Sequence, residues 1–180
     1  SMEKVTLHRL QQMKQRGERI TMLTAYDYPT ALSMAQAGVD ILLVGDSLGM
    51  VVHGFENTLP VTMDMMVLHC QAVRRGAPQA FIVGDMPFMS YSSREQALDN
   101  AVRLMQEGGA KMVKLESGAG QVEIVEFLAS HDIPVCAHLG LRPQSIHKQG
   151  GFRVQGREEA QARKMIDDAK ALEGAGADLV

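Results

Sequence analysis

The stretch AQAGVDILLVGD, residues 35–46, decides the fold expected for this chain. It reads as the end of a helix, a glycine at the helix C-terminus, a short turn and a buried strand. The same order returns in RRGAPQAFIVGD (74–85), QEGGAKMVKLES (106–117) and LEGAGADLV (172–180). Helices and strands that alternate through short turns predict βα units and a parallel sheet.

Short apolar runs supply the strands of this sheet. They do not alternate strictly between polar and apolar residues, which favours strands covered on both faces. The runs are ITMLTAYD (20–27), ILLVGD (41–46), AFIVGD (80–85), KMVKLES (111–117) and PVCAHLG (134–140), and a further strand begins at 178–180.

Helical patterns lie between these runs. Residues 62–75 carry an apolar stripe, with Thr62 in the position of an N-cap. Ser92 and Glu95 have the spacing of a capping box before a second stripe, and residues 158–173 form a third.

A parallel sheet could close as a (β/α)8 barrel or stay open as a doubly wound sheet. The first turn of the open fold normally carries a GxGxxG motif, but TAYDYPTA (24–31) stands here. We therefore expect an α/β protein with a (β/α)8 TIM barrel. A complete barrel needs about 250 residues, so residues 1–180 are expected to form a single, incomplete barrel domain of about five and a half βα units, ending at the sixth strand.

The composition excludes several classes of protein. The net charge of -3 gives no electrostatic reason to expect nucleic acid as a partner. No run approaches the roughly 18 apolar residues of a membrane span, and the N-terminus lacks a signal peptide, so no membrane is expected. Two isolated cysteines, Cys70 and Cys136, are typical of a reducing compartment, which predicts a cytoplasmic protein.

Acidic residues end three successive strands: Asp46, Asp85 and Glu116. The C-terminal ends of parallel barrel strands meet at one mouth, where active sites of this fold lie. A hard cation such as Mg²⁺ takes carboxylate oxygens and would offset the repulsion between these acids. The alternative is that each acid is a helix N-cap or a solvated strand end.

Other polar residues are expected near the same mouth. Lys114 lies two residues before Glu116, so both face one side of their strand, where Lys114 could receive a carboxylate or an oxyanion or simply pair with Glu116. Ser47 offers a hydroxyl and a backbone N–H to a carboxylate. His138 could donate to the substrate, support a ligand or have only a structural role.

Two connections, 48–60 and 141–156, are long for βα loops and are candidate lids or binding loops. The second carries potentially cationic groups that would suit an anionic substrate or cofactor, although a plain surface loop is the alternative. These groups are Arg142, His147, Lys148 and Arg153.

Taken together, these segments resemble the ketopantoate hydroxymethyltransferase family. The resemblance lies in TAYDYPTA, LLVGDSLGMVVHG, NTLPVT, AVRRGAP, DMPFMSY, MVKLE, PVCAHLGLRPQS and GGFRVQGR, which follow the order of the family and span nearly all of 20–180. It implies a barrel of the phosphoenolpyruvate/pyruvate-like superfamily. It also implies a homo-oligomer, often a decamer.

The resemblance further implies a site and a reaction. Mg²⁺ would be held by Asp46, Asp85 and Glu116, and a 2-oxo acid by Asp46, Ser47, Asp85 and Lys114, with His138 as a further candidate. Lys114 would stabilise the enolate. The small-molecule partners would be 3-methyl-2-oxobutanoate and the co-substrate 5,10-methylenetetrahydrofolate, whose one-carbon unit is transferred to give 2-dehydropantoate.

The general base of the family is a glutamate shortly after the sixth strand, and it is expected beyond Val180. Tyr26, Asp27 and His138 are the titratable groups nearest the expected mouth, and none corresponds to that base. Two alternatives stay open at this point. One is a non-catalytic fragment that binds metal and oxo acid. The other is a Mg²⁺-dependent C–C lyase or mutase of the phosphoenolpyruvate mutase/isocitrate lyase type, which would carry a nucleophilic cysteine or a different loop after MVKLE.

Overall fold

The computed structural model describes residues 3–116 and 119–138. The chain divides into two compact units, Ser1–Lys114 and Leu115–Val180, which are described separately. The expected helix 158–173, the loop 141–156 and the strand that begins at 178 lie outside the described residues. A single barrel domain over residues 1–180 stays a prediction.

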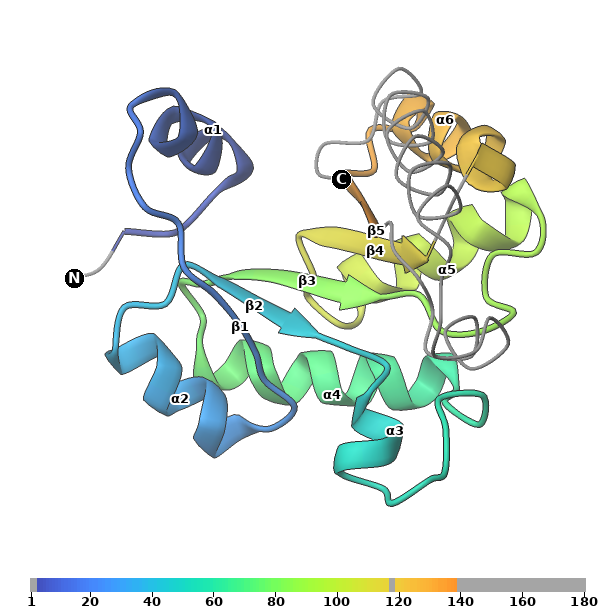
Figure 1. Ribbon diagram of the computed structural model, residues 1–180, viewed down its shortest axis with the longest axis horizontal. Coiled ribbons are helices and arrows are strands. Elements are labelled where there is room, and N and C mark those ends of the chain that lie inside the picture. The colour runs from blue at the N-terminus through green and yellow to red at the C-terminus, as the bar shows by residue number, and fades with distance from the viewer. Residues whose placement is uncertain (1–2, 117–118, 139–180) are drawn as a thin grey trace, which may run out of the picture. The chain divides into compact units, whose positions relative to one another are not determined.

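A parallel sheet organises the first unit (Figure 1). Strands β1 (Met22–Thr24), β2 (Ile41–Val44), β3 (Phe81–Asp85) and β4 (Met112–Glu116) follow one another in chain order, and β4 continues into the second unit. The three neighbouring pairs are all parallel. The strands predicted from the apolar runs are therefore confirmed, although each is shorter than its run.

Five helices accompany these strands: α1 (Leu7–Gln15), α2 (Tyr28–Gln36), α3 (Leu48–Val51), α4 (Met63–Gly76) and α5 (Arg94–Gln106). The predicted start of α4 is confirmed, because the Thr62 hydroxyl accepts a hydrogen bond from the backbone N–H of Met65 at 3.2 Å. α1 and the short α3, which lies within the expected loop 48–60, were not predicted.

The predicted capping box of α5 is wrong by one residue. The N-cap is Ser93, whose hydroxyl accepts from the backbone N–H of Gln96 at 3.1 Å. The backbone N–H of Ser92 instead donates to the side-chain carbonyl of Gln96 at 2.8 Å. Two adjacent serines offer two possible caps, and the side chain at 96 rather than Glu95 reaches back to the first of them.

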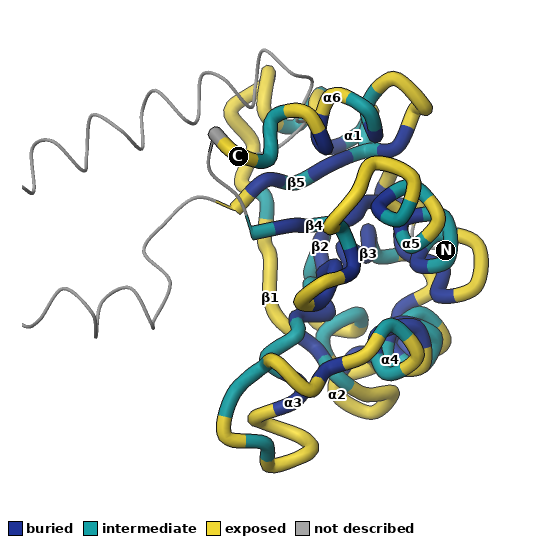
Figure 2. Tube along the Cα trace, turned by 90° about the vertical axis from the view of Figure 1, so that its right-hand side faces the viewer, coloured by how far each residue is buried: buried dark blue, intermediate teal, exposed yellow. Residues whose placement is uncertain are grey.

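The core of the first unit lies along β3 and the helices α4 and α5. Every residue of β3 is buried, as the dark tube in Figure 2 shows. Gly84 makes close packing possible, because a Cβ there would lie 3.3 Å from Cys70 Sγ of α4 and 3.5 Å from Leu104 Cδ2 of α5. The helices therefore rest directly on the strand that carries Asp85 at its end.

Strand β1 departs from the prediction of a fully buried strand. Met22 is 56% exposed and Leu23 is 49% exposed. β1 stands at the end of the strand order and pairs with β2 alone among the described strands. Burial on both faces therefore holds for the interior strands of this sheet and not for its edge.

The second unit contains the end of β4, the 3-10 turn η1 (Ala119–Gln121), helix α6 (Val122–Ser130) and strand β5 (Val135–His138), which is the neighbour of β4 in the sheet. Ile124, Val125 and Leu128 form the buried face of α6. Among the helices of the described ranges, none has the length and apolar character required to cross a bilayer.

Candidate functional site

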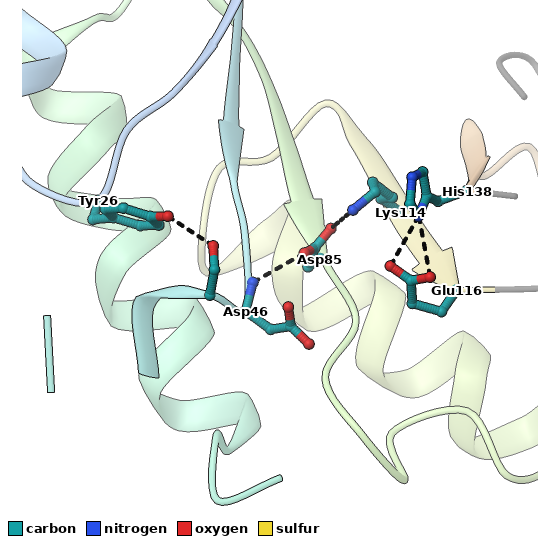
Figure 3. Close-up of polar contacts among 7 residues, drawn as sticks. Tyr26, Asp46, Asp85, Lys114, Glu116 and His138 are labelled. Carbon is teal, nitrogen blue, oxygen red and sulfur yellow. Dashed lines mark hydrogen bonds and ion pairs between the residues drawn. The ribbon is translucent and has the colours of Figure 1, made fainter. Parts of the chain in front are cut away.

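Asp85 is the centre of the polar groups at the C-terminal ends of the first unit's strands (Figure 3). As a residue, Asp85 is only 6% exposed. Oδ1 accepts from Lys114 Nζ at 3.0 Å, and Oδ2 accepts from the backbone N–H of Asp46 at 2.9 Å. Asp85 and Lys114 are partners in the register of β3 and β4, so the sheet itself brings the two charges together.

The turn after β2 brings Asp46 and Ser47 to this carboxylate. A Cβ at Gly45 would lie 3.1 Å from Ser47 Oγ and 3.4 Å from Asp85 Oδ2, so only glycine leaves this approach free of crowding. Gly45 was not predicted from the sequence, although the string GDS at a strand end contains it. The Ser47 side chain makes no capping bond to α3 and instead lies 2.7 Å from the Tyr26 hydroxyl.

Each oxygen of Asp85 accepts one of these two hydrogen bonds. Lys114 is 14% exposed in its side chain, so this ion pair is screened less by water than a surface pair. The buried Asp85 charge also acts on Cys70. Burial first, and Asp85 second, raise the pKa of the Cys70 thiol to about 12, which makes it a structural thiol.

The second unit carries the other two predicted residues on neighbouring strands. Glu116 ends β4 and His138 ends β5. The ring Nδ1 of His138 lies 3.0 Å from Oε1 and 3.1 Å from Oε2 of Glu116. A carboxylate only accepts, so Nδ1 carries a proton and donates it to Glu116. His138 therefore contacts Glu116, and its roles in binding the substrate or supporting a ligand stay predictions.

The donor chemistry of the described residues fits a Mg²⁺ ion that is held only partly by protein groups. In the described ranges no three His, Cys, Asp or Glu side chains form a group that could hold a metal. Mg²⁺ does not need such a group, because it is usually bound through one or two carboxylates, several waters and the oxygens of a substrate. Asp46 and Asp85 supply two carboxylates at adjoining strand ends of the first unit.

Asp27 has a different role from the acids at the site. It is the N-cap of α2, and its Oδ1 accepts from the backbone N–H of Thr30 at 2.8 Å. This hydrogen bond is the main reason why the pKa of Asp27 lies below its ordinary value. Tyr26, its neighbour, contacts the site through Ser47.

The family comparison covers almost the whole chain. The model of the ketopantoate hydroxymethyltransferase family matches residues 4–180. A relative from Nitrosococcus oceani is 61% identical over 179 residues, and one from Halorhodospira halophila is 59% identical over 176 residues. Both are named 3-methyl-2-oxobutanoate hydroxymethyltransferase. The matches cover 99% and 98% of this chain and 68% and 64% of those two proteins, so the chain spans about two thirds of their length.

Solved structures give the fold. A 2,3-dimethylmalate lyase of the PEP mutase/isocitrate lyase superfamily matches with a TM-score of 0.70 at 15% identity, over 98% of this chain and 62% of that one. A phosphonopyruvate hydrolase, solved with oxalate and Mg²⁺, matches with a TM-score of 0.69 at 12% identity, over 96% of this chain and 61% of that one. These likenesses confirm the predicted fold class.

The parallel sheet, the acids at its strand ends and the two close relatives agree with the family match over residues 4–180. The chain belongs to the ketopantoate hydroxymethyltransferase family.

Proposed function

We propose that the protein transfers a hydroxymethyl group from 5,10-methylenetetrahydrofolate to 3-methyl-2-oxobutanoate and so makes 2-dehydropantoate. The observation that carries this proposal is the joining of Asp46, Asp85 and Lys114 by two hydrogen bonds at the ends of neighbouring strands. Two acids and a cation at one place suit a bound cation together with an anionic oxo acid. The names of the relatives supply the hydroxymethyl transfer and its acceptor, and the family resemblance supplies the folate donor.

We assign the divalent cation to Asp46 and Asp85, with Glu116 as a third ligand. The phosphonopyruvate hydrolase structure contains Mg²⁺ and oxalate, and oxalate has the paired oxygens of a 2-oxo acid, which supports a divalent cation but does not identify its ligands. When bound, Mg²⁺ supplies Lewis-acid stabilisation of negative charge on the oxygens of the substrate. His138, hydrogen-bonded to Glu116, holds that carboxylate in a fixed orientation.

Ser47 and Lys114 have different roles, since the first binds the oxo acid and the second stabilises negative charge. The Ser47 hydroxyl donates a hydrogen bond to the carboxylate of the oxo acid. Removal of the C3 proton leaves negative charge on the former keto oxygen, and the Lys114 ammonium stabilises that charge. C3 then bonds to the methylene carbon of the folate, and water supplies the hydroxyl as the two bonds from this carbon to the folate nitrogens break. The two nitrogens take up the proton removed from C3 and one proton of the water.

The general base is proposed to follow Val180, in accordance with the resemblance. A cytoplasmic location and a homo-oligomeric assembly are predictions of the same kind. The lyase or mutase alternative is not favoured, because the solved structures of that type are 12–15% identical whereas the named transferases are 53–61% identical.

The test is product formation by the full-length protein, including any residues that its gene encodes beyond Val180. We expect 2-dehydropantoate to form only when a divalent cation is present. Asp85→Asn and Lys114→Met should each lower kcat at least about 100-fold, since each removes charge at the reacting oxygens. Asp99→Asn, an exposed acid on α5, is the matched control and should retain full activity.

Two outcomes would contradict the proposal. One is turnover of the oxo acid and the folate that continues at the same rate after chelation of the metal. The other is an Asp85→Asn variant that folds normally and keeps the activity of the Asp99→Asn control. Oxo-acid binding without product would instead support the non-catalytic alternative.

A further inference from the structure

A short series of hydrogen bonds joins Ser47 to helix α4. The Tyr26 hydroxyl, which points toward the turn after β2 in Figure 3, lies 2.7 Å from Ser47 Oγ. The backbone carbonyl of the same tyrosine lies 2.6 Å from Nδ1 of His69. Tyr26 therefore connects a residue of the proposed oxo-acid site to a histidine that the proposed chemistry does not use.

The contact with the Tyr26 carbonyl determines which ring nitrogen of His69 carries a proton. A carbonyl oxygen only accepts, so Nδ1 of His69 carries a proton and donates it to Tyr26. In neutral His69 the other nitrogen, Nε2, is then an acceptor. His53 Nε2 lies 3.0 Å from it and supplies the donor, while the His53 ring stacks on Phe55 at a centroid distance of 5.8 Å. His69 is consequently held at both ring nitrogens.

The position of His69 on α4 separates it from the core. His69 is half-buried beside the buried face of that helix, which consists of Met66, Val67, Cys70, Val73 and Gly76. Its hydrogen bond reaches Tyr26, whose two chain neighbours are each held by another hydrogen bond. Ala25 donates its backbone N–H to Leu43 at 3.0 Å on one side, and Asp27 caps α2 on the other.

Ser47 has one hydroxyl proton, and this decides what Tyr26 contributes. An oxo-acid carboxylate only accepts, so it can be bound by Ser47 only if that proton points to the substrate. A donor to Ser47 Oγ then fixes this direction, and the Tyr26 hydroxyl, 2.7 Å away, is placed to be that donor. Phenylalanine in place of Tyr26 would remove this donor, so the Ser47 hydroxyl could turn its proton away from the substrate.

We propose that Tyr26 and His69 are positioning residues for oxo-acid binding: His69 fixes the Tyr26 carbonyl, and the Tyr26 hydroxyl directs the proton of Ser47 to the substrate carboxylate. The inference rests on the proposed function, because it assumes that Ser47 binds the oxo acid. It assigns neither residue a part in proton abstraction. The expected effect is therefore on the KM of one substrate and not on kcat.

The experiment is steady-state kinetics of the full-length protein with Mg²⁺, varying 3-methyl-2-oxobutanoate and the folate separately. Tyr26→Phe removes one neutral hydrogen bond, so the KM of the oxo acid should rise about tenfold. The kcat and the KM of the folate should stay within about twofold. His69→Leu should give the same pattern.

Two further variants separate positioning from a loss of fold. His69→Asn places an amide N–H where Nδ1 stands, and we expect it to restore the KM of the oxo acid to within about twofold of the wild type. The double variant Tyr26→Phe/His69→Leu should be no worse than the worse single variant, because both act through one hydroxyl. Leu68→Ala, an exposed neighbour on α4, is the control without effect.

The proposal is overturned if Tyr26→Phe leaves the KM of the oxo acid unchanged, if His69→Asn is as defective as His69→Leu, or if the effects of the two positions multiply. It is also overturned if kcat and both KM values deteriorate together in the well-folded Tyr26→Phe protein. Wild-type protein that fails to turn over the oxo acid contradicts the proposed function itself. The wild-type measurement therefore tests the proposed function, and only the variants test the positioning role of Tyr26 and His69.

Discussion

Asp85 shows at the scale of one residue how the fold prepares the site. A buried carboxylate is stable only when donors replace the water that it has lost. Here the replacements are the Lys114 ammonium and the backbone N–H of Asp46, both supplied by neighbouring strand ends. The same charges that suit a cation and an oxo acid are therefore part of what keeps the first unit folded.

This dependence predicts a stability effect for Lys114→Met in metal-free buffer. The substitution leaves the buried Asp85 charge without its ion-pair partner, so the free energy of unfolding should fall by about 3 kcal/mol. Urea denaturation measures this change. In the double variant with Asp85→Asn the charge is gone, and the loss should be clearly smaller. Equal losses in the single and double variants would show that the pair does not carry the effect.

The residues of the site were predictable to different degrees. Asp46, Asp85 and Glu116 were found because a charge at the end of an apolar run stands out in the sequence. Tyr26 was placed near the mouth, but its contacts with Ser47 and His69 were not predicted, because they join residues 21 and 43 positions apart that only the folded chain brings together. Whether the three acids share one metal ion stays a prediction.

Helix ends set the positions of the elements around the site. The sequence identifies the Thr62 cap correctly, since that threonine directly precedes the apolar stripe of α4. It does not distinguish Ser92 from Ser93, because both hydroxyls have the right chemistry and only the path of the loop decides between them. The sequence also places Asp27 near the mouth of the expected barrel, because Asp27 follows a strand. The same position directly before a helix suits an N-cap, and Asp27 caps α2.

The cap at Asp27 predicts a pH-dependent loss of stability. Asp27→Ala should lower the stability by about 1 kcal/mol near neutral pH, and Asp27→Asn, which can still cap, should lower it less. The Thr30 backbone N–H lowers the pKa of Asp27 in the folded protein. The charge-dependent stabilisation is therefore present above the ordinary pKa of 3.8 and is lost as the pH falls through the lowered value.

Thermal unfolding of the three proteins from pH 7 down to the most acidic pH at which they refold measures this effect. The difference in unfolding temperature between the wild type and Asp27→Asn should become smaller toward acid pH. A gap that is constant over the whole range would contradict a contribution from the ionised cap.

The contact between α2 and α4 depends on a glycine. A Cβ at Gly76 would lie 2.6 Å from the Tyr28 carbonyl oxygen and 3.0 Å from the Leu32 backbone nitrogen. Because these are backbone atoms within a helix, they cannot turn aside as a flexible side chain would. Gly76→Ala should therefore lower the free energy of unfolding by about 2 kcal/mol, measured in urea.

Gly120→Ala is the matched control, because a Cβ there would meet nothing within 4 Å. It should be neutral or slightly stabilising, since alanine restricts the unfolded chain. A Gly76→Ala protein as stable as this control would mean that the two helices separate at little cost.

At the scale of the whole molecule, the repeated βα unit predicted the parallel sheet and the end of the strands at which the acids lie. It did not predict the exposure of β1, which among the described strands pairs with β2 alone, because a strand's own residues do not say which strands lie beside it. The family match over residues 4–180 and the fold of the solved relatives agree with this architecture. The central claim is that this site forms an enolate of a 2-oxo acid.

The most direct test of that claim is the exchange of the C3 proton of 3-methyl-2-oxobutanoate with heavy water, followed by proton NMR in the absence of the folate. The full-length protein with Mg²⁺ should remove the C3 signal much faster than buffer does, and either chelation of the metal or Asp85→Asn should abolish the effect. Saturating metal-dependent binding of the oxo acid by the wild type, with exchange no faster than in buffer, would contradict the account.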